Sequence, residues 1–389
     1  MKMGKWFLKF LVVFVCCFAF SSLSLAQENL PASNKSAGEL YSIGLSYSEK
    51  GNYEKALTYF EKAVKKNPSY MAEAYYFAIG DCNDELNRYT EAIEAYKQAI
   101  QLKPDFDLAY HSLGLVYGKL GRHTEAMEAF KQVISINPDY ALAHRNLGVA
   151  YGELGNYTEA IGAHKQAIRI DPDDVEAYRN LGVAYGELGS YAEAIQVYKQ
   201  ALRINPEFAG AHYNLGTVYA TLGRYTEAME AFKQAIHINP DDAEAYCNLG
   251  LAYTELGRYT EAIEACKQAI HIKPNDAEAY NNLGAAHSKL ESPNEAMEAY
   301  KQAIRINPDF AEAHYNLGTV YGILGRRIEA IEEWKQTIRI KPDDAKAHYA
   351  LGGAYYLTLG DKSSALDEYK ILKKLDPDRA NKLFNLIYK

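Results

Sequence analysis

The 389-residue sequence lacks the short motifs that accompany catalysis. It has no glycine-rich phosphate loop, no HExxH zinc motif and no nucleophile elbow. Two histidines at the same point of neighbouring repeats, His237 and His271, have no carboxylate or thiol placed to complete a tetrahedral metal site. We therefore predict that the protein is not an enzyme and that it holds no metal and no cofactor.

The sequence also lacks an excess of basic residues. It has 42 Lys and Arg against 50 Asp and Glu, which gives a formal net charge of −8 at pH 7. Nucleic acids and anionic membrane surfaces both select basic patches or stripes. We therefore predict that the protein binds no nucleic acid and does not bind a bilayer through charge alone.

Cysteine is scarce, with 5 in the chain, two of them in an N-terminal apolar run. The other three are Cys82, Cys247 and Cys266, an odd number that cannot form a complete disulfide framework. We interpret them as small packing residues, because unpaired cysteine is among the most buried residue types.

A long apolar run occurs only near the N-terminus, at Phe10–Phe20. It follows three lysines and precedes small residues that end at Ala26, which is the layout of a secretory signal peptide. The run is well short of the roughly 20 residues that span a bilayer as a helix. We predict a signal peptide at residues 1–26 and export to the periplasm or the medium. The alternative is an uncleaved membrane anchor at residues 6–26, and only then would the protein contact a membrane.

Regular repetition dominates the rest of the chain, and its 12 prolines mark the period. Eight of them recur every 34 residues, and the spacing is slightly longer to Pro68 before the series and to Pro377 after it. The eight are Pro104, Pro138, Pro172, Pro206, Pro240, Pro274, Pro308 and Pro342. Self-similarity at a fixed period of this length indicates a solenoid of stacked units.

Residues 209–242 show how one repeat is built. Two sets of apolar residues at helical spacing predict two helices. The first set is Leu215, Gly216 and Tyr219, and the second is Ala228, Phe232 and Ala235. Gly223 suits the end of the first helix and Pro240 the end of the second. The predicted fold class is therefore all-α, a solenoid of antiparallel helix pairs.

Two positions of this repeat predict particular contacts. Glycine within a helix costs about 1 kcal/mol relative to alanine, so Gly216 needs a packing role. We expect it to face Ala228, so that two small residues bring the helices close together. At the start of the next helix, we expect Asp241 and Glu244 to cap the backbone reciprocally.

The combined pattern L-G-x-x-Y, then A-x-x-x-F/Y, A and P, resembles the tetratricopeptide repeat superfamily. Ten such units run over residues 37–379, with departures at Asn83 and Glu291. The resemblance implies a right-handed superhelix whose first helices line a concave groove, and most members of the superfamily are adaptors or scaffolds. Residues 27–36 are predicted to be a polar linker, and residues 380–389 a helix that caps the last repeat.

A column of asparagines is the strongest candidate for function. Each stands directly before a Leu-Gly pair, and they are Asn146, Asn180, Asn214, Asn248, Asn282 and Asn316. Helical geometry places them off the buried stripe, where an amide can donate to and accept from an extended peptide backbone. The column resembles the asparagine ladder of the repeat superhelix in protein O-glycosyltransferases. The alternative is that asparagine is common here in the superfamily and only helps each unit to pack.

The residue just before this column varies from repeat to repeat. In chain order it is Tyr41, Phe77, His111, Arg145, Arg179, Tyr213, Cys247, Asn281, Tyr315 and Tyr349. The four that join the asparagines in the predicted peptide-binding groove are Arg145, Arg179, Tyr213 and Tyr315. The two arginines suit an acidic side chain of a partner, unless Glu153 and Glu187, two turns along the same helices, neutralise them.

These features predict a monomeric scaffold or adaptor whose groove binds an extended or helical segment of a partner protein. Two alternatives remain from the sequence. One is a structural or oligomerising component of the cell envelope, and the other is an accessory subunit of an envelope or secretion complex.

Overall fold

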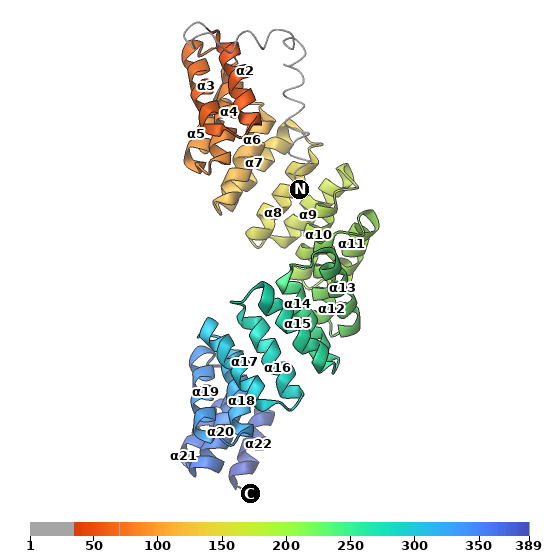
Figure 1. The fold of residues 1–389 in the computed structure, drawn as a ribbon, viewed down its shortest axis with the longest axis vertical. Coiled ribbons are helices and arrows are strands. Elements are labelled where there is room, and N and C mark those ends of the chain that lie inside the picture. The colour runs from red at the N-terminus through yellow and green to blue at the C-terminus, as the bar shows by residue number, and fades with distance from the viewer. Residues whose placement is uncertain (1–34, 70, 389) are drawn as a thin grey trace. The chain divides into compact units, whose positions relative to one another are not determined.

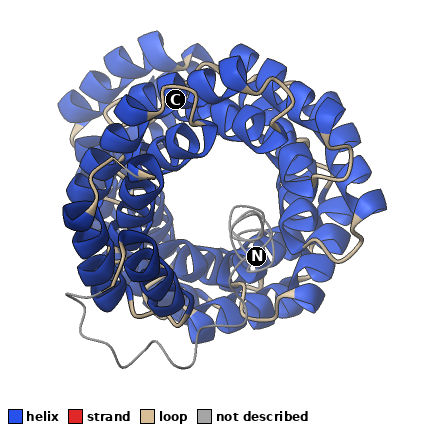
Figure 2. Cartoon of the chain, turned by 90° about the horizontal axis from the view of Figure 1, so that it is seen from above, coloured by secondary structure: helices blue, strands red, loops and turns tan. Residues whose placement is uncertain are grey.

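The computed structural model describes residues 35–69 and 71–388 (Figure 1). These residues form 21 helices, α2 to α22, and no strand (Figure 2). The predicted signal peptide at 1–26, the alternative anchor at 6–26 and most of the predicted linker at 27–36 lie outside the described residues. Within the described part, consecutive helices pack as antiparallel pairs, which confirms the predicted all-α fold class.

Each repeat contributes a first and a second helix, and one further helix follows the last repeat. The first helices are α2 (Ala37–Glu49), α4 (Ala72–Glu85), α6 (Asp107–Lys119), α8 (Ala141–Glu153), α10 (Val175–Glu187), α12 (Ala209–Thr221), α14 (Ala243–Glu255), α16 (Ala277–Lys289), α18 (Ala311–Ile323) and α20 (Ala345–Leu359). The second helices are α3 (Tyr53–Lys66), α5 (Tyr89–Leu102), α7 (His123–Ile136), α9 (Tyr157–Ile170), α11 (Tyr191–Ile204), α13 (Tyr225–Ile238), α15 (Tyr259–Ile272), α17 (Pro293–Ile306), α19 (Arg327–Ile340) and α21 (Lys362–Leu375). The last helix is α22 (Pro377–Tyr388).

The chain divides into two compact units between Pro172 and Asp173. In the first unit, helices α2 to α9, the first helices α4, α6 and α8 contact one another in turn. In the second unit, helices α10 to α22, the first helices α10, α12, α14, α16 and α18 do the same. First helices therefore lie side by side within each unit, and their solvent-facing residues form one surface.

The recurring glycine of the first helix makes room, in most repeats, for a ring of the second helix. A Cβ placed on Gly216 would lie 2.7 Å from the ring of Phe232, and on Gly284 2.7 Å from the ring of Tyr300. The sequence analysis expected Ala228 opposite Gly216 and did not foresee the ring. At Gly250, where Cys266 replaces the ring, the backbone oxygen of Ala262, the equivalent of Ala228, is 3.4 Å from such a Cβ. Residues 16 apart meet because the two helices run antiparallel, and the ring is the group that needs the missing Cβ.

Left-handed backbone ends the first helix in each repeat. Glycine fills this position in eight turns, for example Gly223 with φ of 70°. Asn87 and Glu291 fill the same position in two other repeats with φ of 58° and 56°. Asparagine tolerates this conformation, whereas glutamate has no such preference, so the turn at Glu291 is strained.

The helix caps differ from the sequence prediction by one residue. Asp242, not Asp241, is the N-cap of α14, and its Oδ1 accepts from the Ala245 N–H at 3.0 Å. Pro240 and Asp241 form a turn in which the Asp242 N–H donates to the Asn239 carbonyl at 3.3 Å. Because that turn uses Asp241, the following residue is the first one free to cap the helix.

Helix α22 packs against α20 and α21 at the end of the second unit. It begins at Pro377, earlier than the Ala380 expected from the sequence, because proline suits the first helical turn and Asp376 accepts from the Arg379 N–H at 3.0 Å. Its Leu383 is fully buried and lies against Gly352, at the place where other repeats have a ring of the second helix.

Candidate protein-binding face

The six predicted asparagines lie half-buried on first helices. Asn146 is on α8 in the first unit, and the other five are on α10 to α18 in the second unit. Leucine and glycine follow each of them into the core, as Leu215 and Gly216 do after Asn214. The amides therefore stand at the edge of the buried stripe, where one side of each is open to solvent.

Four of the amides hydrogen-bond to the preceding repeat. The Nδ2 group of Asn248 donates to Tyr213 Oη at 3.1 Å, and that of Asn316 donates to Asn281 Oδ1 at 3.2 Å. The remaining two bonds are Asn146 Nδ2 to His111 Nε2 at 3.0 Å and Asn282 Nδ2 to Cys247 Sγ at 3.3 Å. In every case the partner is the variable residue of the preceding repeat, 35 positions earlier.

These bonds link the column of asparagines to the column of variable residues, each asparagine to the variable residue of the preceding repeat. The sequence analysis missed the link, although the spacing of 35 between an asparagine and the previous variable residue was visible in it. Asn180 and Asn214 have an arginine at that spacing, and an arginine side chain has no acceptor atom. Asn146, Asn248 and Asn316 each use one N–H to hold the adjacent repeat and keep a carbonyl oxygen and a second N–H for other bonds. The Asn282 amide also donates to the Cys247 carbonyl oxygen at 3.5 Å and keeps its own carbonyl oxygen.

Of the two arginines of the predicted groove, Arg179 pairs with an acidic residue and Arg145 lies near a histidine. Arg179 Nε donates to Glu176 Oε2 at 2.8 Å, one turn earlier on α10, so the expected neutralisation by Glu187 is not the contact that forms. This pair is partly exposed and contributes little to stability. Arg145 lies close enough to His111 to affect it. Burial, and secondarily the Arg145 charge, lower the pKa of His111 to about 4.

The two tyrosines of the predicted groove lie on α12 and α18. The ring of Tyr213 packs 5.9 Å from that of Phe232, and its hydroxyl donates to Glu244 Oε2 at 3.5 Å while it accepts from Asn248. Burial, with the nearby Glu244 carboxylate, raises the pKa of Tyr213. Tyr315 is half-buried at the same position of α18.

Exposed aliphatic residues follow the asparagines by three positions, which the sequence analysis did not recognise as a surface. Val149, Val183 and Leu251 are 41%, 39% and 37% exposed. Thr217 and Thr319 are the exposed residues at the same place on α12 and α18. We call the surface formed on α10 to α18 by the asparagines, the residue before each and the residue three after each the first-helix face of the second unit.

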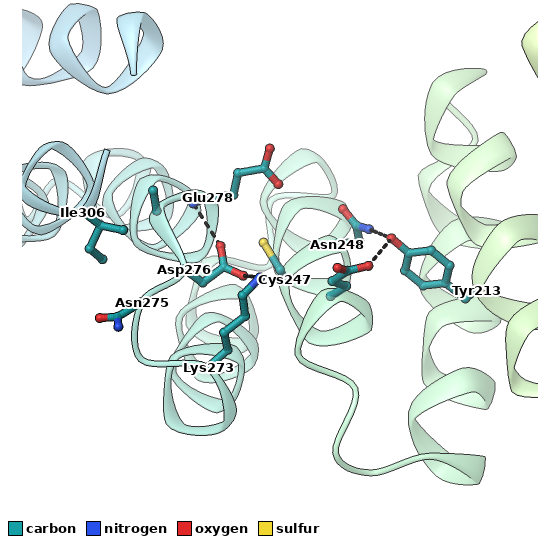
Figure 3. A pocket seen from close by; sticks show the side chains of 10 residues that line it. Tyr213, Cys247, Asn248, Lys273, Asn275, Asp276, Glu278 and Ile306 are labelled. Atoms are coloured by element: carbon teal, nitrogen blue, oxygen red, sulfur yellow. Dashed lines mark hydrogen bonds and ion pairs between the residues drawn. The ribbon is translucent and has the colours of Figure 1, made fainter. Parts of the chain in front are cut away.

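A pocket of about 440 Å³ opens on this face (Figure 3). Its walls come from α12, α14, the end of α15, the start of α16 and the end of α17. The lining residues used below are Tyr213, Glu244, Cys247, Lys273, Glu278 and Ile306. The sequence analysis named Glu244 only as a helix cap and did not name Asp276 or Glu278, because acidic residues recur at the start of the first helices.

The three cysteines of the described chain are buried and form no disulfide, which confirms the interpretation of Cys82, Cys247 and Cys266 as packing residues. Burial, together with the carboxylates of Asp276 and Glu278, raises the pKa of Cys247 to about 12. Burial also raises the pKa of Cys266. Neither thiol is therefore a nucleophile at neutral pH.

Histidines of the first helices have structural hydrogen bonds. His212 Nε2 lies 2.9 Å from the carbonyl oxygen of Pro206, and His348 Nε2 lies 2.9 Å from that of Pro342. Within residues 35–69 and 71–388, no group of histidine, cysteine and acidic residues has the arrangement to hold a metal ion. Over the same residues, no helix is both long enough and apolar enough to cross a membrane.

The fold and the face define a class: an all-helical repeat protein with a continuous row of amides on the first helices of its second unit. Family comparisons agree with that class. Residues 172–373 match the C-terminal domain of cilia and flagella-associated protein 70, a tetratricopeptide family model that covers just over half of the chain. Residues 85–121, 119–155 and 150–189 match the TPR repeat, and residues 37–70 match the tetratricopeptide repeat. The chain belongs to the tetratricopeptide repeat superfamily.

Individual relatives match short segments. The protein O-mannosyl-transferase tmtc2 of Xenopus laevis is 33% identical over 95 residues, 23% of this chain and 11% of that protein. The peroxisomal targeting signal receptor of Saccharomyces cerevisiae is 36% identical over 73 residues, 19% of this chain and 12% of that protein. The matched segments thus span about a tenth of each curated relative.

A solved structure extends the likeness over most of the chain. The crystal structure of the APC/C hetero-tetramer Cut9-Hcn1 has a TM-score of 0.54 and 16% identity, and the match covers 91% of this chain and 76% of that one. This similarity shows the fold alone. The superfamily is one of protein-interaction scaffolds, and that is the class to which this chain is assigned.

Proposed function

We propose that the protein is a scaffold that binds an extended segment of a partner protein on the first-helix face of the second unit. The observation that carries the proposal is the row of oriented amides. Asn248 and Asn316 are each held by one N–H against the preceding repeat. A held amide presents its carbonyl oxygen and second N–H at fixed positions, so it loses little freedom when it pairs with a peptide backbone.

The residues around the amides support the same proposal. Exposed aliphatic side chains such as Val183 and Leu251 offer apolar contact next to the polar row. Binding sites commonly combine a polar row that orients the ligand with apolar contacts that supply affinity. The yeast relative is named as a receptor for a peroxisomal targeting signal. The variable residues, Arg179 and Tyr213 among them, would give each repeat its own side-chain preference.

A comparison of two triple variants tests the proposal. The mature chain is used as bait on an extract of its native source, and captured proteins are identified by mass spectrometry. One variant carries Asn180→Ala, Asn214→Ala and Asn248→Ala, and the matched control carries Gln200→Ala, Gln234→Ala and Gln268→Ala on second helices α11, α13 and α15. Each variant removes three amides.

We expect the asparagine variant to lose a partner that the wild type and the glutamine variant both retain. A partner retained equally by both variants would place binding elsewhere on the molecule and would contradict the proposed role of the amides. Circular dichroism of both variants checks that the helices remain folded.

The alternative of an oligomerising envelope component differs in its prediction for the isolated protein. We propose a monomer, because the end of the second unit is covered by α22 and its buried Leu383 and Ile387. Light scattering should then give the mass of one chain at micromolar concentration. A concentration-dependent increase to multiples of that mass would favour the oligomerising role.

We also propose that the protein is exported. The support is the layout of residues 1–26, a basic start followed by an apolar run and small residues. Mass spectrometry of the protein from its source should find Gln27 as the first residue. An intact N-terminus, with the protein in the membrane fraction, would favour the anchor at residues 6–26.

A further inference from the structure

The pocket on the first-helix face has a small residue where the preceding repeat has a ring. In that preceding repeat, Tyr213 of α12 packs against Phe232 of α13, with ring centroids 5.9 Å apart. One repeat later, the position of Tyr213 is Cys247 of α14, which is buried and lines the pocket. The position of Phe232 is Cys266 of α15, which is fully buried. The next repeat has Asn281 at the first position and again a ring, Tyr300, at the second.

The opening of this space carries negative charge. Glu244 and Glu278 are exposed at its edge, and neither forms an ion pair with any residue of the described chain. Asp276 also lines the pocket, but its carboxylate already caps α16 by accepting from the Glu278 and Ala279 N–H groups at 3.1 and 3.2 Å. Lys273 Nζ lies 3.3 Å from Asp276 Oδ2, and Glu244 also acts on its charge, so one positive charge faces three carboxylates at this opening.

Part of the pocket lining suits a hydrocarbon chain. Ile306 and Ala277 line one part of the pocket, and the ring of Tyr213 lines another (Figure 3). Lysine and arginine side chains combine an aliphatic stem with a cationic end, so they bury the stem on apolar surface and keep the charge near water or acidic groups. The apolar wall of the pocket suits the aliphatic stem of such a side chain, and the acidic rim suits its cationic end.

We infer that this pocket receives a cationic side chain, lysine or arginine, of the partner segment bound to the first-helix face. The stem lies against Cys247 and the ring of Tyr213, and the charged end lies between Glu244 and Glu278. The inference rests on the proposed function, because the side chain must arrive as part of a bound peptide. It adds a chemical requirement to that function: a basic residue at the point of the segment that crosses α14.

A set of host peptides tests this chemistry directly. The host is acetyl-Gly-Ser-Gly-X-Gly-Ser-Gly-amide, with X as lysine, arginine, glutamine, norleucine or glutamate. Binding to the full chain is followed by saturation-transfer NMR on the peptide protons, which detects weak complexes. We expect saturation of the side-chain methylenes of the lysine or arginine peptide, and the comparison of these two shows which cation fits.

Filling the pocket and changing its charge should each change the affinity for the cationic peptide, and separate variants test the two effects. Cys247→Tyr restores the residue that Tyr213 and Tyr315 provide at the same position of α12 and α18, and it should weaken binding of the cationic peptide by about tenfold. Glu244→Gln with Glu278→Gln should weaken it by about fivefold without filling the space. Lys273→Asn, which copies Asn239 of the preceding repeat, should strengthen it by about threefold.

Equal binding of the glutamine or norleucine peptide would overturn the inference, as would tighter binding of the glutamate peptide through Lys273. No binding of any peptide would also overturn it. The pull-down with asparagine variants does not depend on these outcomes, so the pocket inference can fail while the proposed scaffold function stands. The glutamate variants keep the test valid if Cys247→Tyr does not fold.

Discussion

At the residue scale, the structure gives the asparagines a role that joins the two interpretations left open by the sequence. One N–H of Asn146, Asn248, Asn282 and Asn316 packs the repeat against its predecessor. The same bond fixes the direction of the amide, which is what a backbone-binding ladder requires. Packing and binding therefore do not exclude each other at this position, because an amide has more than one hydrogen-bonding group.

His111 should make the first unit sensitive to acid. Its pKa, 6.5 in the unfolded chain, is lowered to about 4 in the fold by burial and by Arg145, while Asp107 acts in the opposite direction. The folded state then binds fewer protons, so stability is full above the unfolded pKa and decreases as pH falls from 6.5 toward 4. At pH 5 the loss should be about 2 kcal/mol. Protonation of Nε2 would also break the bond from Asn146.

The matched variant for this measurement is His111→Phe. Phe77 holds the same position in α4 and packs 5.8 Å from Tyr96 and 5.1 Å from Phe106, much as His111 packs against Phe130 and Tyr140. Urea unfolding at pH 7 and pH 5 should show a smaller acid effect in the variant than in the wild type. The same acid effect in both proteins would mean that His111 does not titrate as described.

At the element scale, the strained turn between α16 and α17 offers a stabilising substitution. Glu291 has φ of 56° where Gly257 of the preceding repeat has 74°. Glu291→Gly should raise the free energy of unfolding by about 1 kcal/mol, because glycine adopts this conformation without the clash of a Cβ. Gly257→Glu is the reverse change in a matched turn and should lower it by a similar amount. Thermal unfolding of both variants measures these changes in stability. A loss of stability in Glu291→Gly would contradict the interpretation that the turn is strained.

Helix α22 should contribute strongly to the stability of the last repeat. Leu383 is fully buried, with 0% of its surface accessible to solvent, and it fills the space against Gly352. Leu383→Ala should cost about 3 kcal/mol, since it removes buried methyl groups and leaves a cavity. Leu375→Ala in α21, where the leucine is 39% exposed, is the control and should cost well under half of that. Hydrogen exchange in α20 and α21 measures both, and equal effects would mean that α22 does not hold this end.

At the scale of the whole molecule, contacts are local in sequence. Each helix packs on its sequence neighbours and on the nearest helix of the same kind, within a unit that ends at Pro172 or starts at Asp173. In such repeat proteins stability is close to a sum of repeat and nearest-neighbour terms. A unit with its own core should therefore fold without the rest of the chain.

The second unit should fold as an isolated fragment. Residues 173–389 contain core clusters that involve Tyr198, Phe232 and Tyr300, together with the capping helix α22. Circular dichroism of this fragment should give the helix content of the same residues in the full chain, with a cooperative thermal transition. A fragment that is largely unfolded would show that the first unit supplies an essential interface.

The sequence by itself determined the repeat, its period and its two helices. Helical periodicity and the turn residues glycine and proline act within a few positions, so residues 209–242 were enough to predict the pair α12 and α13. Even the misplaced cap at Asp241 was wrong by only one residue. The sequence was enough to locate the helices and turns, because the backbone preference of each residue depends mainly on its neighbours in sequence and little on residues far along the chain.

Only the tertiary structure decided which residues meet between helices and between repeats. The ring of Phe232 against Gly216, the bond from Asn248 to Tyr213, and the pocket at Cys247 all join positions from 16 to 35 residues or more apart. These contacts depend on how one helix is rotated against the next. The identity of a single residue does not specify that rotation. The pocket in particular lies where α14 has Cys247 in place of the ring that α12 has, and an omitted ring becomes a space only when the surrounding helices are in place.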